Sequence, residues 1–407
     1  MRRDRAAIAG ISILLLSLAN ASVHAASANA QRSQASPPMQ TPPGQSNVLT
    51  ATVWTGPYGN YINGPFTHVT ICQPGTDSCQ TIGGILIDTG SSGLRIFNQA
   101  KRLTLPSVTT AKGEPIAECV AFGTLSTWGR VAFADVKLGG EPTIPSMPIQ
   151  VINAGYGVVP AICRSGPPLA LSPGQIGYNG ILGVGLWGAD CGGACATLGP
   201  QNPSMYFACG PLGCRLTPMA EAAQVQNPVA LLPEDNDGVV LKLPLIPFLG
   251  APSVSGKLVL GINTRGNNKL GDASIFLADD LGNIATTFNN RTIDGFVDSG
   301  SNALFFNASI PQCDPTLAAG FYCPSDLMVL GAINTGRNGS ATGPVAFSVA
   351  NAVGLAATGN KAFYDVAGTF GAPFFDFGLP FFYGRNVYTG IDGVTTPGAT
   401  AGPYFAY

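Results

Sequence analysis

The sequence predicts an all-β fold from its turn residues, its strand-sized apolar runs and its scarcity of helical patterns. The 407 residues include 53 glycines and 33 prolines, and short runs of β-branched and aromatic residues alternate with Gly, Pro and Asn turns from Val48 onward. Hydrophobic residues make up 45% and charged residues 10%, which supplies a large core and argues against disorder. The 20 basic and 22 acidic residues leave no basic excess for binding nucleic acid.

Residues 1–25 are predicted to be a signal peptide. Arg2, Arg3 and Arg5 precede an apolar run from Ala6 to Ala19 that is too short to span a bilayer, and small residues near Ala25 offer a cleavage site. Residues 26–47, rich in Ala, Ser, Gln and Pro, are expected to form a flexible leader. We therefore expect a secreted or periplasmic protein with no stable membrane span, the alternative being an uncleaved N-terminal anchor.

Several segments after the leader have the composition of β-strands, and one has that of a helix. The helix candidate is Thr217–Gln226, within a stretch from Asp190 to Asp237 that is rich in Cys, Pro and Asn and is expected to be an insertion of loops. The predicted strands are Thr50–Trp54, His68–Ile71, Ile85–Ile87, Arg130–Val136 and Lys257–Leu260.

All 10 cysteines follow the predicted signal peptide, and an even number in an exported chain predicts disulfides. Cys72 and Cys79 flank a turn and are expected to pair. The isolated Cys313 and Cys323 are also expected to pair, which leaves Cys119 and Cys163 for each other. The pairing of the other four stays open, and a zinc site built from them is the rival interpretation. These four are Cys191, Cys195, Cys209 and Cys214.

An internal repeat is the most informative feature of the sequence. The segment Ile85–Leu94, which contains Asp88-Thr89-Gly90-Ser91, recurs as Gly295–Leu304, which contains Asp298-Ser299-Gly300-Ser301. A later apolar segment that ends in glycine also occurs twice, as Ile181-Leu182-Gly183 and, more weakly, as Asp376-Phe377-Gly378. One Asp-Gly turn alone would be ordinary, whereas two copies that each follow an apolar strand indicate a shared site.

A pair of aspartates suits general acid–base chemistry. Two carboxyl groups that lie close together cannot both ionise, so they share one proton and supply an acid and a base at the same pH. Such a pair can activate a water and protonate a carbonyl oxygen, which hydrolyses a peptide bond without a covalent intermediate. The catalytic candidates are Asp88 and Asp298. Gly90 and Gly300 are expected to permit close backbone approach, Thr89 and Ser299 to bond across the two halves, and Ser91 and Ser301 to hold the outer carboxylate oxygens.

Other hydrolytic chemistries have little support in the sequence. It contains 2 histidines, His24 in the predicted signal peptide and His68 in a predicted strand, and no Gly-x-Ser-x-Gly segment. A Ser-His-Asp hydrolase and a histidine-rich metal site are therefore not expected. No metal or organic cofactor is implied.

These motifs resemble those of the pepsin-like aspartic proteases, from about residue 50 to Gly378 and in the family's order. Tyr178–Gly185 is similar to the family's Asp-Gly-Ile-Leu-Gly-Leu-Gly segment, and the hairpin around Phe122, Gly123 and Thr124 is similar to its flap over the substrate. The resemblance implies a bilobal acid-protease fold with a central cleft. The N-terminal lobe, 48–267, would carry Asp88 and the flap, and the C-terminal lobe, 268–407, would carry Asp298.

The sequence also departs from the family's pattern. Phe122 replaces the flap tyrosine, Arg95 stands where the family often has Trp, and Phe377-Gly378-Leu379 replaces a late Leu-Gly-Asp. Arg95, if near the first side-chain pocket, would admit an acidic group. No lysine occurs between Arg5 and Lys101, so the family's basic pro-segment is missing and activation by self-cleavage of that type is not expected.

The resemblance predicts an exported aspartic endopeptidase, similar to bacterial relatives of pepsin. It would act as a monomer on a peptide or protein substrate held in extended conformation. Two alternatives stay open. One is a catalytically silent binding or inhibitor protein with the same fold. The other is a disulfide-rich structural surface protein with no cleft, which a large distance between Asp88 and Asp298 would support.

Overall fold

The computed structural model describes residues 46–369, 371 and 373–407, so the predicted signal peptide and most of the predicted leader lie outside the described residues. The chain is 42% strand and 11% helix, which confirms the predicted all-β class. The last residues assigned to a flexible leader are fixed in place. Asn47 is fully buried and its side-chain amide donates to the carbonyl oxygen of Leu260 at 2.9 Å, while the carbonyl of Ser46 accepts from the backbone N–H of Gly140 at 2.7 Å.

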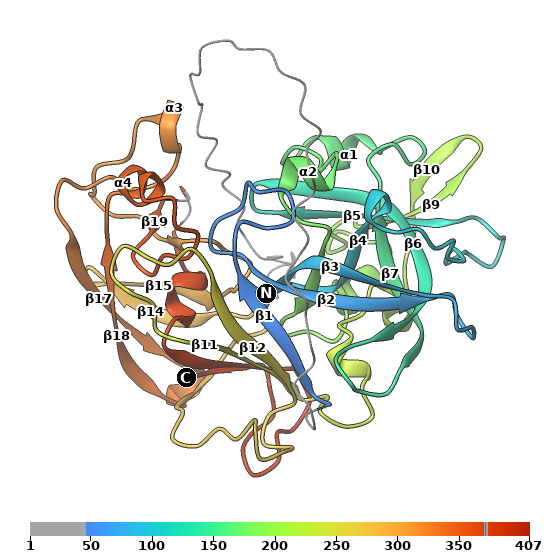
Figure 1. Cartoon of the computed structure of the whole chain (residues 1–407). Coiled ribbons are helices and arrows are strands. Elements are labelled where there is room, and N and C mark those ends of the chain that lie inside the picture. The colour runs from blue at the N-terminus through green and yellow to red at the C-terminus, as the bar shows by residue number, and fades with distance from the viewer. Residues whose placement is uncertain (1–45, 370, 372) are drawn as a thin grey trace.

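The larger of two sheets contains 15 of the described strands, in the order β10-β9-β5-β6-β7-β4-β8-β3-β2-β1-β12-β11-β21-β22-β13. An additional pairing of β6 with β2 closes part of it into a barrel-like ring (Figure 1). Its strands are β1 (Val48–Val53), β2 (Pro65–Cys72), β3 (Cys79–Asp88), β4 (Ser92–Phe97), β5 (Ile116–Phe122), β6 (Leu125–Lys137), β7 (Ile144–Ile152), β8 (Gly180–Val184), β9 (Tyr206–Gly210), β10 (Gly213–Leu216), β11 (Gly238–Leu243), β12 (Val254–Leu260), β13 (Ile275–Leu277), β21 (Arg385–Gly390) and β22 (Tyr404–Ala406).

The smaller sheet contains 7 of the described strands, in the order β18-β17-β14-β15-β20-β16-β19. It occupies the left side of Figure 1, whereas β2 to β7 of the larger sheet occupy the right, with β1 and β12 between them. Strands from both sides of residue 267 share the larger sheet, because β11 pairs with β21. The strands of the smaller sheet are β14 (Ile284–Phe288), β15 (Arg291–Val297), β16 (Leu304–Phe305), β17 (Met328–Thr335), β18 (Thr342–Val349), β19 (Ala367–Gly368) and β20 (Phe374–Phe377).

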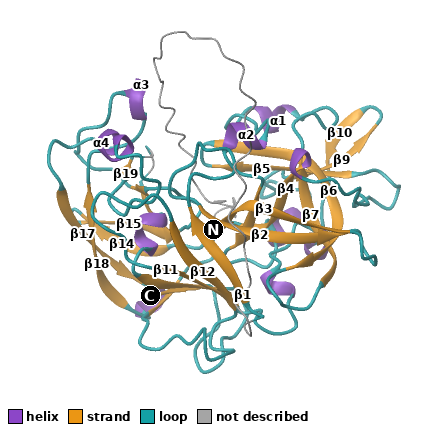
Figure 2. Cartoon of the chain, viewed as in Figure 1, coloured by secondary structure: helices purple, strands orange, loops and turns teal. Residues whose placement is uncertain are grey.

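The helices are short and lie outside the sheets (Figure 2). None of those in the described part of the chain is long and apolar enough to cross a membrane. The α-helices are α1 (Ala161–Arg164), α2 (Pro173–Ile176), α3 (Pro315–Ala318) and α4 (Ala352–Ala357), and the 3₁₀ helices are η1 (Asn98–Ala100), η2 (Gly192–Cys195), η3 (Glu221–Ala223), η4 (Val229–Leu231), η5 (Arg337–Gly339) and η6 (Leu379–Phe382).

The predicted helix Thr217–Gln226 is wrong, since only η3 forms there. Hydrogen bonds hold this segment in an extended path. The side-chain amide of Gln224 donates to the carbonyl of Met219 in the same segment at 2.8 Å and to that of the more distant Gly192 at 2.9 Å. The N–H of Val225 donates to the hydroxyl of Tyr206 at 2.8 Å. The predicted loop insertion also contains β9 and β10, which extend the larger sheet beside β5. The predicted strands fall on β1, β2, β3, β6 and β12.

The internal repeat is also a repeat of topology. In the first half, β8 lies between β3 and β4, parallel to β3 and antiparallel to β4. In the second half, β20 lies between β15 and β16, parallel to β15 and antiparallel to β16. The two glycine-ending segments are therefore the central strands of two equivalent units. In each unit the aspartate turn connects the two outer strands, β3 to β4 and β15 to β16.

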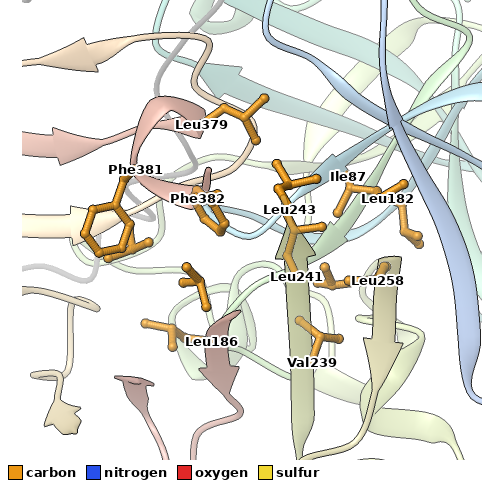
Figure 3. Close-up of a cluster of buried hydrophobic side chains, with 14 of the residues drawn as sticks. Ile87, Leu182, Leu186, Val239, Leu241, Leu243, Leu258, Leu379, Phe381 and Phe382 are labelled. Atoms are coloured by element: carbon orange, nitrogen blue, oxygen red, sulfur yellow. The ribbon is translucent and has the colours of Figure 1, made fainter. Parts of the chain in front are cut away.

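One hydrophobic core joins the two sheets. Figure 3 shows one cluster of buried side chains that extends from Ile87 of β3 and Leu182 of β8, past Leu241 of β11, to Phe382 and Phe381 of η6. Burial of this many apolar side chains is the main stabilising term of the fold. The same cluster includes Ile87 at the end of β3 and Val297 at the end of β15, the residues that precede the two aspartates.

The described cysteines form five disulfides, and the three predicted pairs are confirmed. These are Cys72–Cys79, Cys119–Cys163 and Cys313–Cys323. The four cysteines whose pairing stayed open join as Cys191–Cys195 and Cys209–Cys214, which overturns the rival zinc site. The short sequence separation within each of these two pairs matches the tight turns of β9–β10 and η2.

Candidate functional site

The two aspartate turns meet, although 210 positions separate their equivalent residues. The N–H of Thr89 donates to the hydroxyl of Ser299 at 3.1 Å, and the N–H of Ser299 donates to the hydroxyl of Thr89 at 2.9 Å. The hydroxyl of Ser299 in turn donates to the carbonyl of Ile87 at 2.9 Å. The bonds predicted across the two halves are therefore present. The large distance between Asp88 and Asp298 that would have supported a structural protein is not observed.

The two glycines of the turns explain how close the carboxyl groups come. A Cβ atom on Gly90 would lie 2.4 Å from Cγ of Asp298, and one on Gly300 would lie 2.8 Å from Cγ of Asp88. Each carboxyl group therefore rests against the backbone of the opposite turn. Any larger residue at either glycine would push the two aspartates apart.

Each carboxylate is held by its own turn in nearly the same way. Asp88 accepts from the N–H groups of Gly90 at 2.9 Å and Ser91 at 3.2 Å, and from the hydroxyl of Ser91 at 2.5 Å. Asp298 accepts from the N–H of Gly300 at 2.7 Å and from the hydroxyl of Ser301 at 2.8 Å. In each case backbone bonding reaches Oδ1 and the serine hydroxyl reaches Oδ2. The predicted roles of Ser91 and Ser301 match these contacts.

Both aspartates are almost fully buried, with 4% of Asp88 and 1% of Asp298 exposed. Burial raises the pKa of Asp298 well above its usual value, and the charge of Asp88 and a hydrogen bond with its carboxyl group raise it further. The bonds from Ser301 and Gly300 oppose this shift. None of the ion pairs among the described residues involves either aspartate. The arrangement favours one shared proton between the two carboxyl groups.

Asp376 is a third carboxyl group in this network, and its role was not predicted from the sequence. Asp376 lies in β20, is fully buried, and its Oδ2 is 2.5 Å from the hydroxyl of Ser301. The register places it beside Phe296, the equivalent of Leu86, whose neighbour in the first half is Ile181. A charged residue at a position that is apolar in the other copy of the repeat is the signal that could have identified it.

Tyr61 was also missed. Its ring is buried, packs edge-on against Tyr178 with ring centroids 5.9 Å apart, and lies where a Cβ on Gly64 or Gly177 would clash, at 2.5 and 2.8 Å. Its hydroxyl has no hydrogen-bond partner among the described residues. Burial raises the pKa of Tyr61, and the charges of Asp88 and Asp298 raise it further, which places this hydroxyl within electrostatic reach of both. No sequence motif marks this position.

The segment assigned to the flap is a hairpin, with Phe122 of β5 paired to Leu125 of β6 and Gly123 and Thr124 at the turn. The Phe122 ring is buried and lies over the guanidinium of Arg95, with 5.4 Å between Cζ and the ring centroid. Phe122 therefore contacts a charged group of the protein itself. No hydroxyl is present at this position to bond to a substrate.

Arg95 does not provide the acid-binding pocket that the sequence suggested. Its side chain is 1% exposed and bonds to Glu118 at 2.9 Å and to Asp190 at 2.7 Å. Tyr206 donates to the other oxygen of Asp190 at 2.6 Å. The guanidinium is thus already neutralised by two buried carboxyl groups, and it tethers β5 to β4.

No group of three or more His, Cys, Asp or Glu side chains suited to a metal ion occurs among the described residues. The chemistry available at the site is that of the carboxyl groups and their hydroxyl partners.

Comparison with known proteins gives a family but no activity. A family model described as "Protein of unknown function (DUF3443)" matches residues 43–407, a span that includes both aspartate turns and β20. No curated protein matches the chain.

Proposed function

The chain belongs to this family of proteins of unknown function, and from its site we propose that it is an exported aspartic endopeptidase with the bilobal pepsin-like fold. The observation that carries the proposal is the close approach of Asp88 and Asp298: two buried carboxyl groups, each packed against the glycine of the opposite turn and each held by backbone N–H groups and a serine hydroxyl of its own turn. The repeated units β3-β8-β4 and β15-β20-β16 support the two-lobed fold.

The proposed reaction uses the single proton shared by the two aspartates. The ionised carboxylate removes a proton from a water as the water oxygen attacks the carbonyl carbon of the peptide bond. The protonated carboxyl group gives its proton to the carbonyl oxygen. The resulting tetrahedral diol collapses as the amide nitrogen is protonated and the C–N bond breaks. The raised pKa of Asp298 favours Asp298 as the group that holds the proton at the start.

The substrate class follows from the fold that we propose. An extended polypeptide would lie across the dyad beneath the β5–β6 hairpin and bond to strand edges, with side chains in pockets. The predicted signal peptide and the five disulfides support export to an oxidising compartment, either periplasmic or extracellular.

The test is cleavage of an unfolded protein by the purified chain between pH 3 and 7, with and without pepstatin. Asp88→Asn and Asp298→Asn are each expected to lower the rate by roughly 10²- to 10⁴-fold, because neither can share the proton. Asp77→Asn, in the exposed β2–β3 turn, is the matched control and should leave the rate unchanged. Equal rates in Asp88→Asn and the unaltered protein would contradict the proposal.

The same experiment separates the second candidate, a catalytically silent binding or inhibitor protein. The observation that favours it is Phe122, which has no hydroxyl at the position where the pepsin-like proteases have the flap tyrosine. Tight binding of peptides without cleavage at any pH in the range would support this candidate and exclude the protease.

A further inference from the structure

A cavity lies beside the smaller sheet, between the edge strand β18 and the segment from η6 to the start of β21. Its volume is about 630 Å³, within the range of pockets that hold small molecules. Most of its wall is apolar, and the exposed rim includes Leu245 and Val329, each 78% exposed. Residues that line the interior include Leu304, Val345, Phe347, Phe377, Phe381 and Arg385.

Arg385 is the charged group of this cavity. Its guanidinium lies over the ring of Phe381, 4.6 Å from the centroid, and donates to the carbonyl of Phe381 at 2.7 Å. These two contacts fix the planar head while leaving several of its five N–H donors for another partner. The orientation is therefore set before any ligand arrives.

Arg385 has no counter-ion. Within residues 46–369, 371 and 373–407, no carboxylate lies within ion-pair distance of it. Its charge interacts with the phenol of Tyr407, but burial raises the pKa of that phenol to about 12, so the phenol is neutral at physiological pH. A guanidinium stays protonated even where burial lowers its pKa, as it does here. Partial burial of an unpaired charge raises the free energy of the folded protein, and a bound anion would lower it.

We infer that this cavity binds a long-chain monocarboxylate, a fatty-acid-like molecule with its carboxylate on Arg385 and its hydrocarbon chain along Val345, Phe347 and Phe381. A planar guanidinium binds a carboxylate through two parallel hydrogen bonds. The wall beyond it offers apolar area and few polar partners, which suits a hydrocarbon chain better than a peptide, because each peptide residue brings an N–H and a C=O. The inference does not depend on protease activity.

The test is calorimetric titration with dodecanoate, kept below its micellar concentration. One molecule is expected to bind per chain. Arg385→Gln should weaken binding at least tenfold, since a charge-assisted pair is lost. Ala346→Trp, a change at an exposed residue of the cavity wall, should also weaken it by filling the space. The matched control is Arg291→Gln, at the exposed first residue of β15 in the same sheet, and it should bind as the unaltered protein does.

Dodecanol, which has the same chain without the charge, is expected to bind at least tenfold more weakly than dodecanoate. Circular dichroism of each variant checks that it is folded. Absence of saturable binding, equal affinity in Arg385→Gln and Arg291→Gln, or binding of a neutral apolar peptide in place of dodecanoate would each overturn the inference.

Discussion

Ser301 has one hydroxyl proton and two carboxyl neighbours, at 2.8 Å for Asp298 and 2.5 Å for Asp376. One proton can serve only one of these contacts as donor, so the other contact needs a proton on a carboxyl group. Ser91 has no such conflict, because Ile181 occupies the place of Asp376 in the first half. The two aspartates of the dyad are therefore not equivalent, and the extra carboxyl group belongs to the Asp298 side.

Replacement of Asp376 is predicted to shift the pH dependence of the reaction. In Asp376→Asn the amide donates to the Ser301 oxygen, which frees the serine proton for Asp298 and lowers the pKa of Asp298. The alkaline limb of the pH–rate profile should move to lower pH by about half to one unit, the equivalent of roughly 1 kcal/mol. Measurement of kcat/KM against pH checks this, and Ile181→Val, a conservative change at the equivalent position, should leave the limb in place. A shift of the limb to higher pH would contradict it.

The raised pKa of Asp298 also predicts a dependence of stability on pH. The folded state holds the proton more tightly than the unfolded state, whose value is near 3.8. The stability that this group contributes is thus fully present below that value and is lost as the pH rises through the raised pKa. In Asp298→Asn, which cannot titrate, the free energy of unfolding should fall less between pH 4 and pH 8. Urea unfolding across this range measures it, and parallel curves for the two proteins would refute the assignment.

At the scale of elements, a buried ion cluster joins the β5–β6 hairpin to β4 of the same sheet and to the loop that carries Asp190. Arg95 of β4 bonds to Glu118 of β5 and to Asp190, and burial together with Glu118 raises the pKa of Asp190. Arg95→Met would leave two buried carboxyl groups without their cation. The expected loss of stability is about 3–5 kcal/mol.

The matched control for this change is Arg215→Met. Arg215 pairs with Glu114 on the surface of the same region, with 59% of the arginine side chain exposed, so its removal should have little effect. Urea unfolding of the two variants measures both effects. Equal urea midpoints for the two variants would show that the Arg95 cluster does not stabilise the folded protein.

At the scale of the whole molecule, the disulfides differ in how much of the chain they constrain. Cys119–Cys163 closes a separation of 44 residues and Cys191–Cys195 one of 4. Loss of chain entropy in the unfolded state predicts about 4 kcal/mol for the first and about 2 kcal/mol for the second. Double Cys→Ala variants of each pair, compared by urea unfolding, should differ in this order, and the reverse order would contradict the entropic account.

What the sequence predicted correctly lies in short segments. The strands, two of the disulfides and the hydrogen-bonding residues around Asp88 and Asp298 follow from neighbouring residues or from the repeat. The third disulfide, Cys119–Cys163, follows by elimination. Its errors involve contacts between distant segments. The segment Thr217–Gln226 has helical composition, but Tyr206 and Gly192 hold it extended, and Arg95 looks like a free cation until Glu118 and Asp190 surround it. The role of Asp376 was not predicted, because the first half of the repeat has the apolar Ile181 at the equivalent position.

The reciprocal bonds between Thr89 and Ser299 have a consequence for timing during synthesis. As the chain emerges from the ribosome, the first turn waits for a partner that is made much later, and the Asp298 side waits longer still for β20. A nascent fragment that ends before β20 lacks the strand that supports the Asp298 turn. We therefore expect the proposed protease to gain activity only after most of the chain has been made.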